Sequence, residues 1–521
     1  MTLHQQVIEF LSPIRWPLTG VYLFTLAMLC MYGLHRYWLT FVYYRTRPRL
    51  RRPRARFIEL PRVTVQLPMF NERHVAERII EAACRMEYPR DRLQVQVLDD
   101  STDESAAIAR HAVEKKAAEG FDVAYIHRAD RTGFKAGALE NGLKTATGEF
   151  VVVFDADFIP PEGFIKRTIH HFTDEKVGMV QGCWDHLNRN LSLLTRCQAV
   201  FLDSHFLIEH PARNRSGRFM NFNGTAGIWR REAIESAGGW QHDTLTEDVD
   251  LSYRAQMAGW DFVYLPRLQC PAELPPEIHA YKSQQHRWTK GGMQCALKLL
   301  PKLFRSAAPF RVKLEGFFHL TSPLAYVCMV VLMFLFFPAF FVNVAPLDPH
   351  SLEGFFWGVG LFLLTTISAA TFFVASQRRR RRPLWRSIAE VPILMALGLG
   401  MAISNSRAVF EALVGHDSPF VRTPKYNANG RDTDWQQGAK LVRLPAKRAV
   451  ILIELAMAAY LSGCTVVAIV LAKNALVSVP FLALFAAGYW YVGLSSVAGE
   501  SSLIQRLRQA RPALDGLQSR P

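Results

Sequence analysis

The chain has 521 residues, of which 50% are hydrophobic and 12% aromatic, and its mean hydropathy of +0.05 fits neither a purely soluble enzyme nor a protein confined to the membrane. The 61 Lys and Arg residues exceed the 45 acidic residues and give a net charge of +16, but no nucleic-acid-binding motif accompanies them, so we expect no nucleic-acid partner. The eight cysteines include no C-x-x-C pair, which indicates neither a zinc site nor a disulfide framework.

The first predicted element is a transmembrane helix within residues 1–44. Its apolar run, WPLTGVYLFTLAMLCMYGL at 16–34, is long enough to cross a bilayer, which takes about 20 residues. It is too long for the core of a signal peptide. The arginines that follow place its carboxyl end in the cytoplasm by the positive-inside rule. They are Arg45, Arg47, Arg49, Arg51, Arg52, Arg54 and Arg56.

Residues 45–312 have ordinary charge density and are predicted to form a cytoplasmic α/β domain. Short β-branched runs alternate with helical patterns along it, and repeated β-α units predict a mostly parallel sheet covered by helices. The runs are VTVQLPMF from 63, LQVQVLDDS from 93, DVAYIHRA from 122 and EFVVVFDAD from 149.

Polar residues stand where three of these strands end, which is where ligands gather in parallel sheets. They are Asn71 and Glu72, Asp99 and Asp100, and Asp155 and Asp157. The D-x-D pair places two carboxylates on one side of an extended chain, and two carboxylates beside a phosphate form a Mg²⁺ or Mn²⁺ site. A solvated turn or a helix cap is the alternative for a D-x-D taken alone. The apolar strand that precedes it favours the metal site.

Two later segments are also candidates for the site. NGTAGIWRREA, from residue 223, is a small-residue turn where the backbone can approach a ligand closely. LTEDVDLSYRAQMAGW opens a helix with Thr246, Glu247 and Asp248 at its amino end. Simple helix capping would also explain this cluster, and capping and catalysis are compatible.

The segment YKSQQHRWTKGG, at 281–292, precedes a long apolar region. Gln284 and Arg287 are three residues apart and share a face if the segment is helical, with Trp288 beside them. For Arg-Trp alone, a juxtamembrane aromatic beside a lipid-binding arginine is the alternative.

The remainder of the chain is predicted to be mostly membrane-embedded. The connector NVAPLDPHSLEG has no Lys or Arg, whereas QRRRRRPLWRS is rich in Arg, so the apolar runs at 317–343 and 354–376 form a hairpin. The apolar run at 388–404 has basic segments on both sides and must lie in the interface or re-enter, which gives five crossings, with six as the alternative. The predicted segments are a hairpin at 313–376, an interfacial or re-entrant segment and loop at 377–448, a hairpin with runs at 449–472 and 475–497 within 449–500, and a basic tail at 501–521.

Four side chains in these spans are unusual for lipid-facing positions: His319, Glu454, Tyr489 and Trp490. Ionisable groups in spans usually face a bundle interior or an aqueous path, and aromatic rings suit sliding sugars. Pairing of Glu454 with another helix and ordinary packing of the aromatics are the alternatives.

From about residue 60 to 300 the chain resembles the processive family-2 glycosyltransferases: cellulose synthase, hyaluronan synthase and especially the cellulose-synthase-like mannan and glucan synthases. Four motifs carry the resemblance in the family's order. They are LDDSTD with Asp99 and Asp100, DAD with Asp155 and Asp157, Thr246-Glu247-Asp248, and Gln284-x-x-Arg287-Trp288. HRADRTGFKAGALENGL and FNGTAGIWR resemble further pieces of the pattern, and FVRTPK (Phe420 to Lys425) resembles the F-x-V-T-x-K gating loop, with Arg422 in place of Val.

The resemblance implies a GT-A-like domain inserted between transmembrane helices of an inner-membrane protein, which transfers sugar from a UDP- or GDP-sugar to a growing glycan with inversion. Asp248 would be the general base, supported by Glu247 and Thr246. The donor would be held by Asp99, Asp100, Lys135, Asp155 and Arg287, and Mg²⁺ or Mn²⁺ by Asp155 and Asp157. Gln284 would help position the leaving group. Gln284 and Trp288 would also bind the acceptor, with the indole of Trp288 as a flat platform for its sugar.

Three other classes of function compete with a β-glucan or β-mannan synthase. A non-processive glycolipid synthase would use the same donor site on a similar fold. A glycosidase also uses paired carboxylates but needs no diphosphate-binding metal and no membrane bundle. A pure transporter leaves the α/β domain unexplained. Gln-x-x-Arg-Trp together with the gating-loop candidate favours the polymer synthase.

Overall fold

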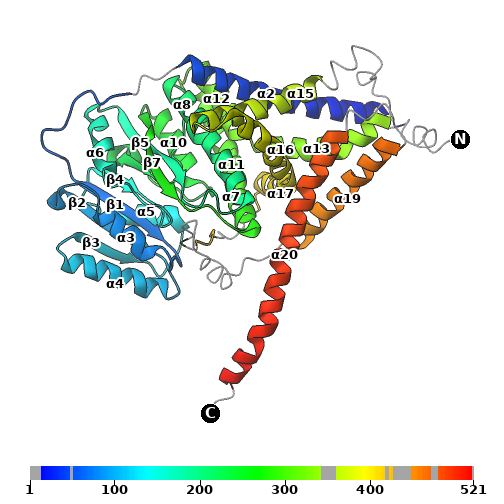
Figure 1. Cartoon of the computed structure of the whole chain (residues 1–521). Helices are drawn as coiled ribbons and strands as arrows, with labels where there is room; N and C mark the ends of the chain where they lie inside the picture. The colour runs from blue at the N-terminus through cyan, green and yellow to red at the C-terminus, as the bar shows by residue number, and fades with distance from the viewer. Residues whose placement is uncertain are drawn as a thin grey trace.

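A computed structural model of the chain describes residues 13, 15–46, 51–341, 360–416, 422–425, 427, 448–470 and 479–518. An α/β domain lies beside a bundle of long helices, and helix α11 (Ile278–Arg305) leads from the first to the second (Figure 1). Helix α20 (Val479–Gln518) extends out of the bundle toward the carboxyl terminus (Figure 1). The connector NVAPLDPHSLEG and residues Phe420 and Val421 lie outside the described residues.

The α/β domain is built on one seven-stranded sheet with the order β3-β2-β1-β4-β6-β5-β7. All neighbouring strands are parallel except β6, which is antiparallel to both β4 and β5. The expected mostly parallel sheet is confirmed, and β1 to β4 lie where the sequence predicts strands. The strands are β1 (Val63–Met69), β2 (Leu93–Asp99), β3 (Asp122–His127), β4 (Phe150–Val153), β5 (Val177–His186), β6 (Gly227–Arg230) and β7 (Asp261–Ala272).

Helices cover both faces of this sheet, which is why its central strands are apolar at consecutive positions. Val152 belongs to the core on the face covered by α3, α4 and α6, whereas the adjacent Val151 belongs to the core under α5, α9 and α10. The helices of the domain are α3 (Ala76–Cys84), α4 (Ser105–Ala118), α5 (Phe134–Leu143), α6 (Phe164–Thr168), α7 (Leu193–Ser204), α8 (His210–Arg215), α9 (Arg231–Ser236) and α10 (Glu247–Met257).

Three described helices are long and apolar enough to cross a membrane, and the number rises to five if each of two bent pairs is one span. The three are Trp16–Arg45 in α2, Arg448–Val470, which is α19, and Val479–Gly499 in α20. They match the runs expected at 16–34, 449–472 and 475–497. The bent pairs are α12 (Phe310–Thr321) with α13 (Leu324–Phe341), at 56°, and α16 (Leu384–Gly400) with α17 (Ala402–Leu413), at 43°.

The bend between α16 and α17 falls in the segment expected to re-enter or lie in the interface, and a broken span is equally consistent with it. Helix α15 (Leu361–Arg379) occupies much of the run expected at 354–376, although it is not among the helices that meet the length and composition criteria. The predicted boundaries of the membrane segments and the number of crossings stay predictions.

The unusual polar and aromatic side chains of the spans have protein partners. Glu454 of α19 accepts a hydrogen bond from Lys282 of α11 at 2.6 Å, so it pairs with another helix. Tyr489 is fully buried among apolar residues, and Trp490 donates to Ser462 Oγ at 3.0 Å. His319 Nδ1 lies 2.8 Å from the hydroxyl of Tyr253. For these four side chains the packing and pairing alternatives are therefore the ones the structure supports.

Candidate active site

One cavity of about 190 Å³ collects almost all the residues that the sequence singled out. It lies at the carboxyl ends of β1, β2 and β4, and is closed by the amino end of α10, by α11 and by residues 422–425. Of the predicted site residues, those that line it are Asp100, Lys135, Asp155, Asp157, Thr246, Glu247, Asp248, Gln284, Arg287 and Trp288. Four motifs separated by up to about 190 residues of sequence thus share one space.

Asp99 is the predicted donor-binding residue that the structure does not bring to this cavity. Its side chain is fully buried, and its carboxylate accepts hydrogen bonds from the backbone N–H of Ser101 at 2.9 Å and the hydroxyl of Tyr125 at 2.8 Å. The adjacent Asp100 does line the cavity, and it is held by Arg128 at 2.6 and 2.8 Å. Because successive residues of a strand point to opposite sides, only one of the two aspartates faces the ligand space.

The two carboxylates of the D-x-D motif each face a lysine. Lys135 pairs with Asp155 and also donates to the backbone carbonyl of Gly224 at 2.9 Å. Lys425 approaches Asp157 to 2.5 Å. Burial alone would lower the pKa of Lys135, but the carboxylates of Asp155, Glu247 and Asp248 outweigh it and raise that pKa, so this lysine stays charged. The D-x-D pair therefore faces cations already in this structure.

This pair fits a divalent ion that also takes oxygens from a ligand. Among the described residues no group of three or more His, Cys, Asp or Glu side chains could hold a metal by itself. Mg²⁺ and Mn²⁺ need only one or two protein carboxylates when substrate phosphates complete the coordination. Asp155 and Asp157 supply two such carboxylates within one cavity, and the ammonium groups beside them mark positions that favour positive charge.

The acidic cluster at the start of α10 is more than a helix cap. Thr246 stands at the N-cap position, but its side chain makes no capping hydrogen bond and instead lies 3.3 Å from Cys295 Sγ of α11. Withdrawal from water and the neighbouring Glu247 charge raise the pKa of Asp248 to about 7, although Lys135 opposes the shift. Burial likewise raises the pKa of Glu247. A carboxylate with a pKa near neutrality is suited to accepting a proton.

The turn formed by the NGTAG segment allows the close approach that its small residues predict. Gly224 has φ +78°, and a Cβ on it would lie 3.2 Å from Asp248 Oδ2 and 3.3 Å from Lys135 Nζ. Thr225 Oγ1 accepts a hydrogen bond from the backbone N–H of Asp155 at 2.8 Å. This turn thus packs directly between the D-x-D motif and the acidic start of α10.

Helix α11 presents Gln284, Arg287 and Trp288 to the same cavity, as their spacing predicts. Burial lowers the pKa of Arg287. The facing carboxylates, led by Glu247, oppose this shift without cancelling it. The helix lies close to α10 because residue 291 is glycine: a Cβ there would be 2.5 Å from Thr246 Cγ2. His286, adjacent in sequence, points elsewhere and lies 3.0 Å from Glu411 of α17.

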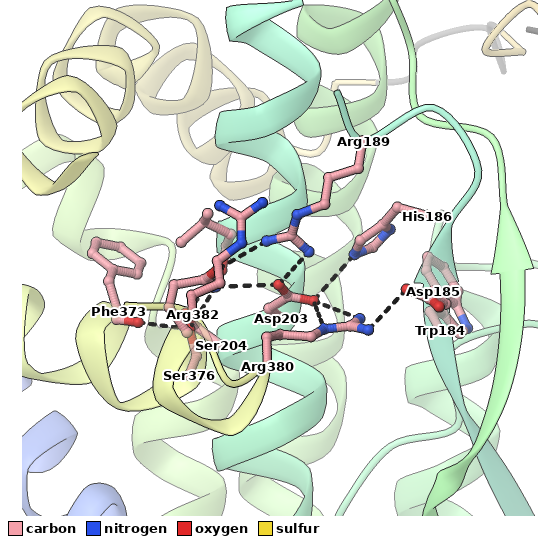
Figure 2. Close-up of polar contacts among 12 residues, drawn as sticks. Trp184, Asp185, His186, Arg189, Asp203, Ser204, Phe373, Ser376, Arg380 and Arg382 are labelled. Atoms are coloured by element: carbon pink, nitrogen blue, oxygen red, sulfur yellow. Dashed lines mark hydrogen bonds and ion pairs between the residues drawn. The ribbon is translucent and has the colours of Figure 1, made fainter. Parts of the chain in front are cut away.

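Trp288 has an aromatic neighbour that the sequence did not reveal. Its ring centroid lies 6.4 Å from that of Trp184, which also stacks on Phe206 at 5.0 Å. Trp184 and His186 belong to the carboxyl end of β5 (Figure 2). Both side chains line the cavity. No motif marks these residues in the sequence. The only local sign of a ligand site is that a tryptophan and a histidine stand at the end of an apolar strand.

The gating-loop candidate reaches the cavity through Arg422, Thr423 and Lys425. Arg422, the departure from the family pattern, pairs with Glu72 at 2.8 Å. Burial raises the pKa of Glu72 to about 7, and Arg422 and Lys425 act against this shift. The arginine thus has a specific carboxylate partner at the end of β1, and the loop is tied to the domain at two points.

A second cavity of about 160 Å³ lies on the far side of Trp288, between the α/β domain and the helix bundle. Trp288 and Gln284 line both cavities. The side-chain oxygens of Gln198 and Asn405 are buried and, within the described part of the chain, have no hydrogen-bond partner. The remaining lining residues are Phe201, Leu202, Tyr281, Gln285, Tyr326, Gly398 and Met401. The aromatic and amide side chains of this lining are suited to sugar rings.

Comparison with known proteins agrees with this geometry. Residues 61–291 match the family described as Glycosyltransferase like family 2. A probable glucomannan 4-beta-mannosyltransferase 6 from Oryza sativa subsp. japonica is 44% identical over 236 residues, which are 44% of this chain and 41% of that protein. The chain thus matches about two fifths of the length of this relative.

The chain is also similar to two solved structures. The mannosyltransferase PcManGT from Pyrobaculum calidifontis, in complex with GDP-Man and Mn²⁺, is 20% identical with a TM-score of 0.47 over 77% of this chain and 100% of its own. S. aureus TarS 1–349 in complex with UDP is 13% identical with a TM-score of 0.35, over 70% of this chain and 95% of its own. The family match and the mostly parallel sheet together establish that residues 61–291 form a GT-A-like glycosyltransferase domain of family 2.

Proposed function

We propose that the chain is an inverting membrane glycosyltransferase that polymerises a β-linked polysaccharide of glucan or mannan type from a nucleotide-diphosphate sugar and moves it through the membrane. One observation carries the proposal: the donor-side carboxylates and the candidate base share a cavity with Trp288, and Trp288 also lines the second cavity, toward the helix bundle. The similarity to a glucomannan mannosyltransferase supports the choice of polysaccharide class.

Asp248 acts as the general base in this mechanism. Its pKa, raised to about 7, lets it take the proton of the acceptor hydroxyl at neutral pH. The freed oxygen attacks the anomeric carbon from the side opposite the diphosphate, so the sugar is transferred with inversion in a single displacement. Lys135, beside Asp155 and Gly224, keeps the acidic cluster in place and carries a positive charge toward the donor.

Arg287 stabilises the departing diphosphate through its guanidinium group, because charge that develops in the transition state is best met by a fixed, partly desolvated cation. Asp100 and Asp155 contribute to the donor side of the cavity. Asp155 and Asp157 would hold Mg²⁺ or Mn²⁺, which when bound neutralises diphosphate charge. Gln284 and Trp288 hold the acceptor sugar, whose apolar ring face suits an indole and whose rim suits an amide.

By the positive-inside rule, the basic segments that flank the apolar helices favour an α/β domain in the cytoplasm, where nucleotide sugars are made available, with the product on the opposite side. A sugar held at Trp288 is next to the second cavity, whose aromatic and amide side chains suit the preceding sugar units. An extended acceptor uses both cavities. A lipid acceptor carrying a single sugar uses the first alone.

The test is an assay of the full-length protein in membranes against a panel of nucleotide sugars, led by GDP-mannose and UDP-glucose because of the glucomannan relative. Transfer of sugar from one of these donors into a glycan, with release of the nucleoside diphosphate, is the expected result. Absence of transfer from every donor in the panel, with folded protein, would refute the proposal.

A further inference from the structure

Asn223 lines the candidate active site, and the oxygen and the nitrogen of its carboxamide each form a hydrogen bond with a histidine. His210 Nε2 lies 2.5 Å from Asn223 Oδ1, and His205 Nε2 lies 3.0 Å from Asn223 Nδ2. On its other side, His205 Nδ1 lies 2.8 Å from Glu209 Oε2. Three hydrogen bonds in series therefore connect His210, Asn223, His205 and Glu209.

Simple hydrogen-bonding rules give this series one direction. The Glu209 carboxylate can only accept, so His205 donates from Nδ1, and because the nitrogen of the Asn223 amide can only donate, His205 accepts at Nε2. Asn223 then donates from Nδ2 to His205, and its oxygen accepts from His210 Nε2–H. Burial lowers the pKa of His210 well below its usual value, which keeps the ring neutral and its Nδ1 unprotonated. Within the described residues that Nδ1 has no hydrogen-bond partner, which fits an unprotonated nitrogen better than an N–H left without an acceptor.

The opposite orientation of the Asn223 amide would break the series. The Asn223 nitrogen would then donate to His210 Nε2, and the neutral His210 ring would carry its proton on Nδ1, where no described residue accepts it. Glu209 stays ionised, because Arg213 and His205 outweigh the effect of burial and hold its pKa well below the usual range. The network therefore selects one of the two orientations of the carboxamide.

The local backbone has an unusual form that places both histidines on one side. Residues His205–Glu209 form a π-helix, with the backbone N–H of His210 bonded to the carbonyl of His205. In an α-helix, residues five apart point about 140° away from each other, whereas the wider turn of a π-helix brings them together. The two imidazole centroids are 4.2 Å apart. Single π-turns often mark functional positions.

The backbone of Asn223 is held as firmly as its side chain. Its N–H donates to Gln181 Oε1 at 3.3 Å, and the preceding Phe222 N–H donates to Ser252 Oγ at 2.8 Å. The next residue, Gly224, adopts φ +78° and accepts a hydrogen bond from Lys135. The side-chain amide of Asn223 still has one N–H and one oxygen lone pair that these hydrogen bonds do not use. Asn223 also directly precedes Gly224, which packs against Asp248.

We propose that Asn223 binds a hydroxyl group of the acceptor sugar next to the hydroxyl that reacts, and that His205 and His210 are positioning residues that fix the orientation of its amide. This inference rests on the proposed function. A fixed amide can accept from and donate to one sugar hydroxyl at the same time, so it discriminates the configuration of that hydroxyl. Holding it rigid avoids the ordering cost that a free side chain has on binding.

The test measures the KM for a soluble oligosaccharide acceptor, the kcat, and the Kd of the nucleotide-sugar donor, with the full-length protein in nanodiscs. We expect Asn223→Ala to raise the acceptor KM about tenfold, the effect of losing a hydrogen bond to a neutral group in a desolvated site. His205→Phe, which keeps a ring but cannot accept, should raise the acceptor KM in the same direction. His205→Gln, whose amide oxygen can accept from Asn223, should restore most of the affinity.

His171 provides a matched control, since it is a buried histidine outside both cavities, and His171→Gln should leave the acceptor KM unchanged. Asn223→Ser serves as a second variant if the alanine form does not fold. An acceptor KM within twofold of wild type in Asn223→Ala or Asn223→Ser would overturn the inference, as would equal effects of His205→Phe and His205→Gln. Failure of the proposed function would be seen differently, as a wild-type protein that transfers no sugar.

Discussion

Arg380, the residue after α15, grips Asp203 of α7 with two of its guanidinium nitrogens, at 2.8 and 3.0 Å from the same carboxylate oxygen (Figure 2). Its third nitrogen lies 2.9 Å from Asp185 at the end of β5. One side chain thus joins a helix of the bundle to two elements of the glycosyltransferase domain. The sequence identifies the Arg-rich segment QRRRRRPLWRS only as a basic flank of the apolar runs, and nothing in it indicates that Arg380 also pairs with a buried carboxylate.

Replacing Arg380 with Ala should destabilise the junction between the bundle and the domain. The carboxylate of Asp203 is fully buried. Without Arg380 its negative charge would be only partly compensated, by Arg189 at 2.6 Å. We expect a loss of about 3 kcal/mol in the free energy of unfolding, at the low end for a broken buried pair. Thermal unfolding in detergent measures it. Arg379→Ala, at an exposed neighbouring position, is the control, and an equal effect of the two would contradict the role given to Arg380.

Asp248→Asn should abolish sugar transfer while leaving donor affinity within a few-fold of wild type. The amide keeps the shape of the carboxylate but cannot take a proton, and loss of a general base costs about a hundredfold to ten-thousandfold in rate. Single-turnover transfer and donor titration measure the two quantities. Substantial transfer by this variant would rule Asp248 out as the base.

The pH dependence of kcat/KM should show an acid limb near pH 7. The pKa of Asp248 is raised to about 7, so below that pH the base is protonated and inactive, and above it the carboxylate is available. The rate should therefore fall about tenfold for each pH unit well below 7. A rate that stays constant down to pH 5 would be inconsistent with a base in this environment.

Chelation with EDTA should stop the reaction, and Asp157→Ala should weaken donor binding. The reason is that Asp155 and Asp157 would hold an ion whose charge would neutralise the donor diphosphate. Donor titration with and without added Mg²⁺ or Mn²⁺ is the measurement. Asp91→Ala, an exposed carboxylate far from the cavity, should behave as wild type. Full activity in chelator would refute the metal assignment.

Two adjacent glycines of α11 offer a paired test of how the helix positions the site. A Cβ at Gly291 would lie 2.5 Å from Thr246 Cγ2 and 2.9 Å from its backbone nitrogen, whereas at Gly292 the nearest atom is Pro323 Cγ at 3.6 Å. Gly291→Ala should push α11 and its Arg287 away from α10 and lower kcat about a hundredfold, as misplacements near 1 Å do. Gly292→Ala should be nearly neutral. Equal kcat values for the two variants would show that this close packing is unimportant.

The sequence predicted the features that depend on local pattern. Apolar runs of β-branched residues located β1 to β4, and the polar residues that end them located one side of the cavity, because parallel strands bring their carboxyl ends together. The spacing of Gln284, Arg287 and Trp288 placed them on one helical face. In these places short-range chemistry decides the structure.

Features that depend on contacts between distant residues could not be predicted in this way. Arg422 and Glu72 are 350 residues apart, and nothing local to either indicates the pair. Lys282 and Glu454 are likewise 172 residues apart, which is why Glu454 read equally well as a path-lining or a paired residue. The exclusion of Asp99 from the cavity follows from the direction of one side chain at the end of β2, a detail that the motif alone does not specify.

The central claim is that the enzyme makes a long glycan and delivers it across the membrane. The most direct measurement uses inverted membrane vesicles that contain the full-length protein, a labelled nucleotide sugar added outside, and sizing of the product. We expect a product of high molecular mass that is insoluble in organic solvent and protected from added glycosidase until detergent opens the vesicles. A product of one sugar that extracts with the lipids would contradict the claim and establish the glycolipid synthase in its place.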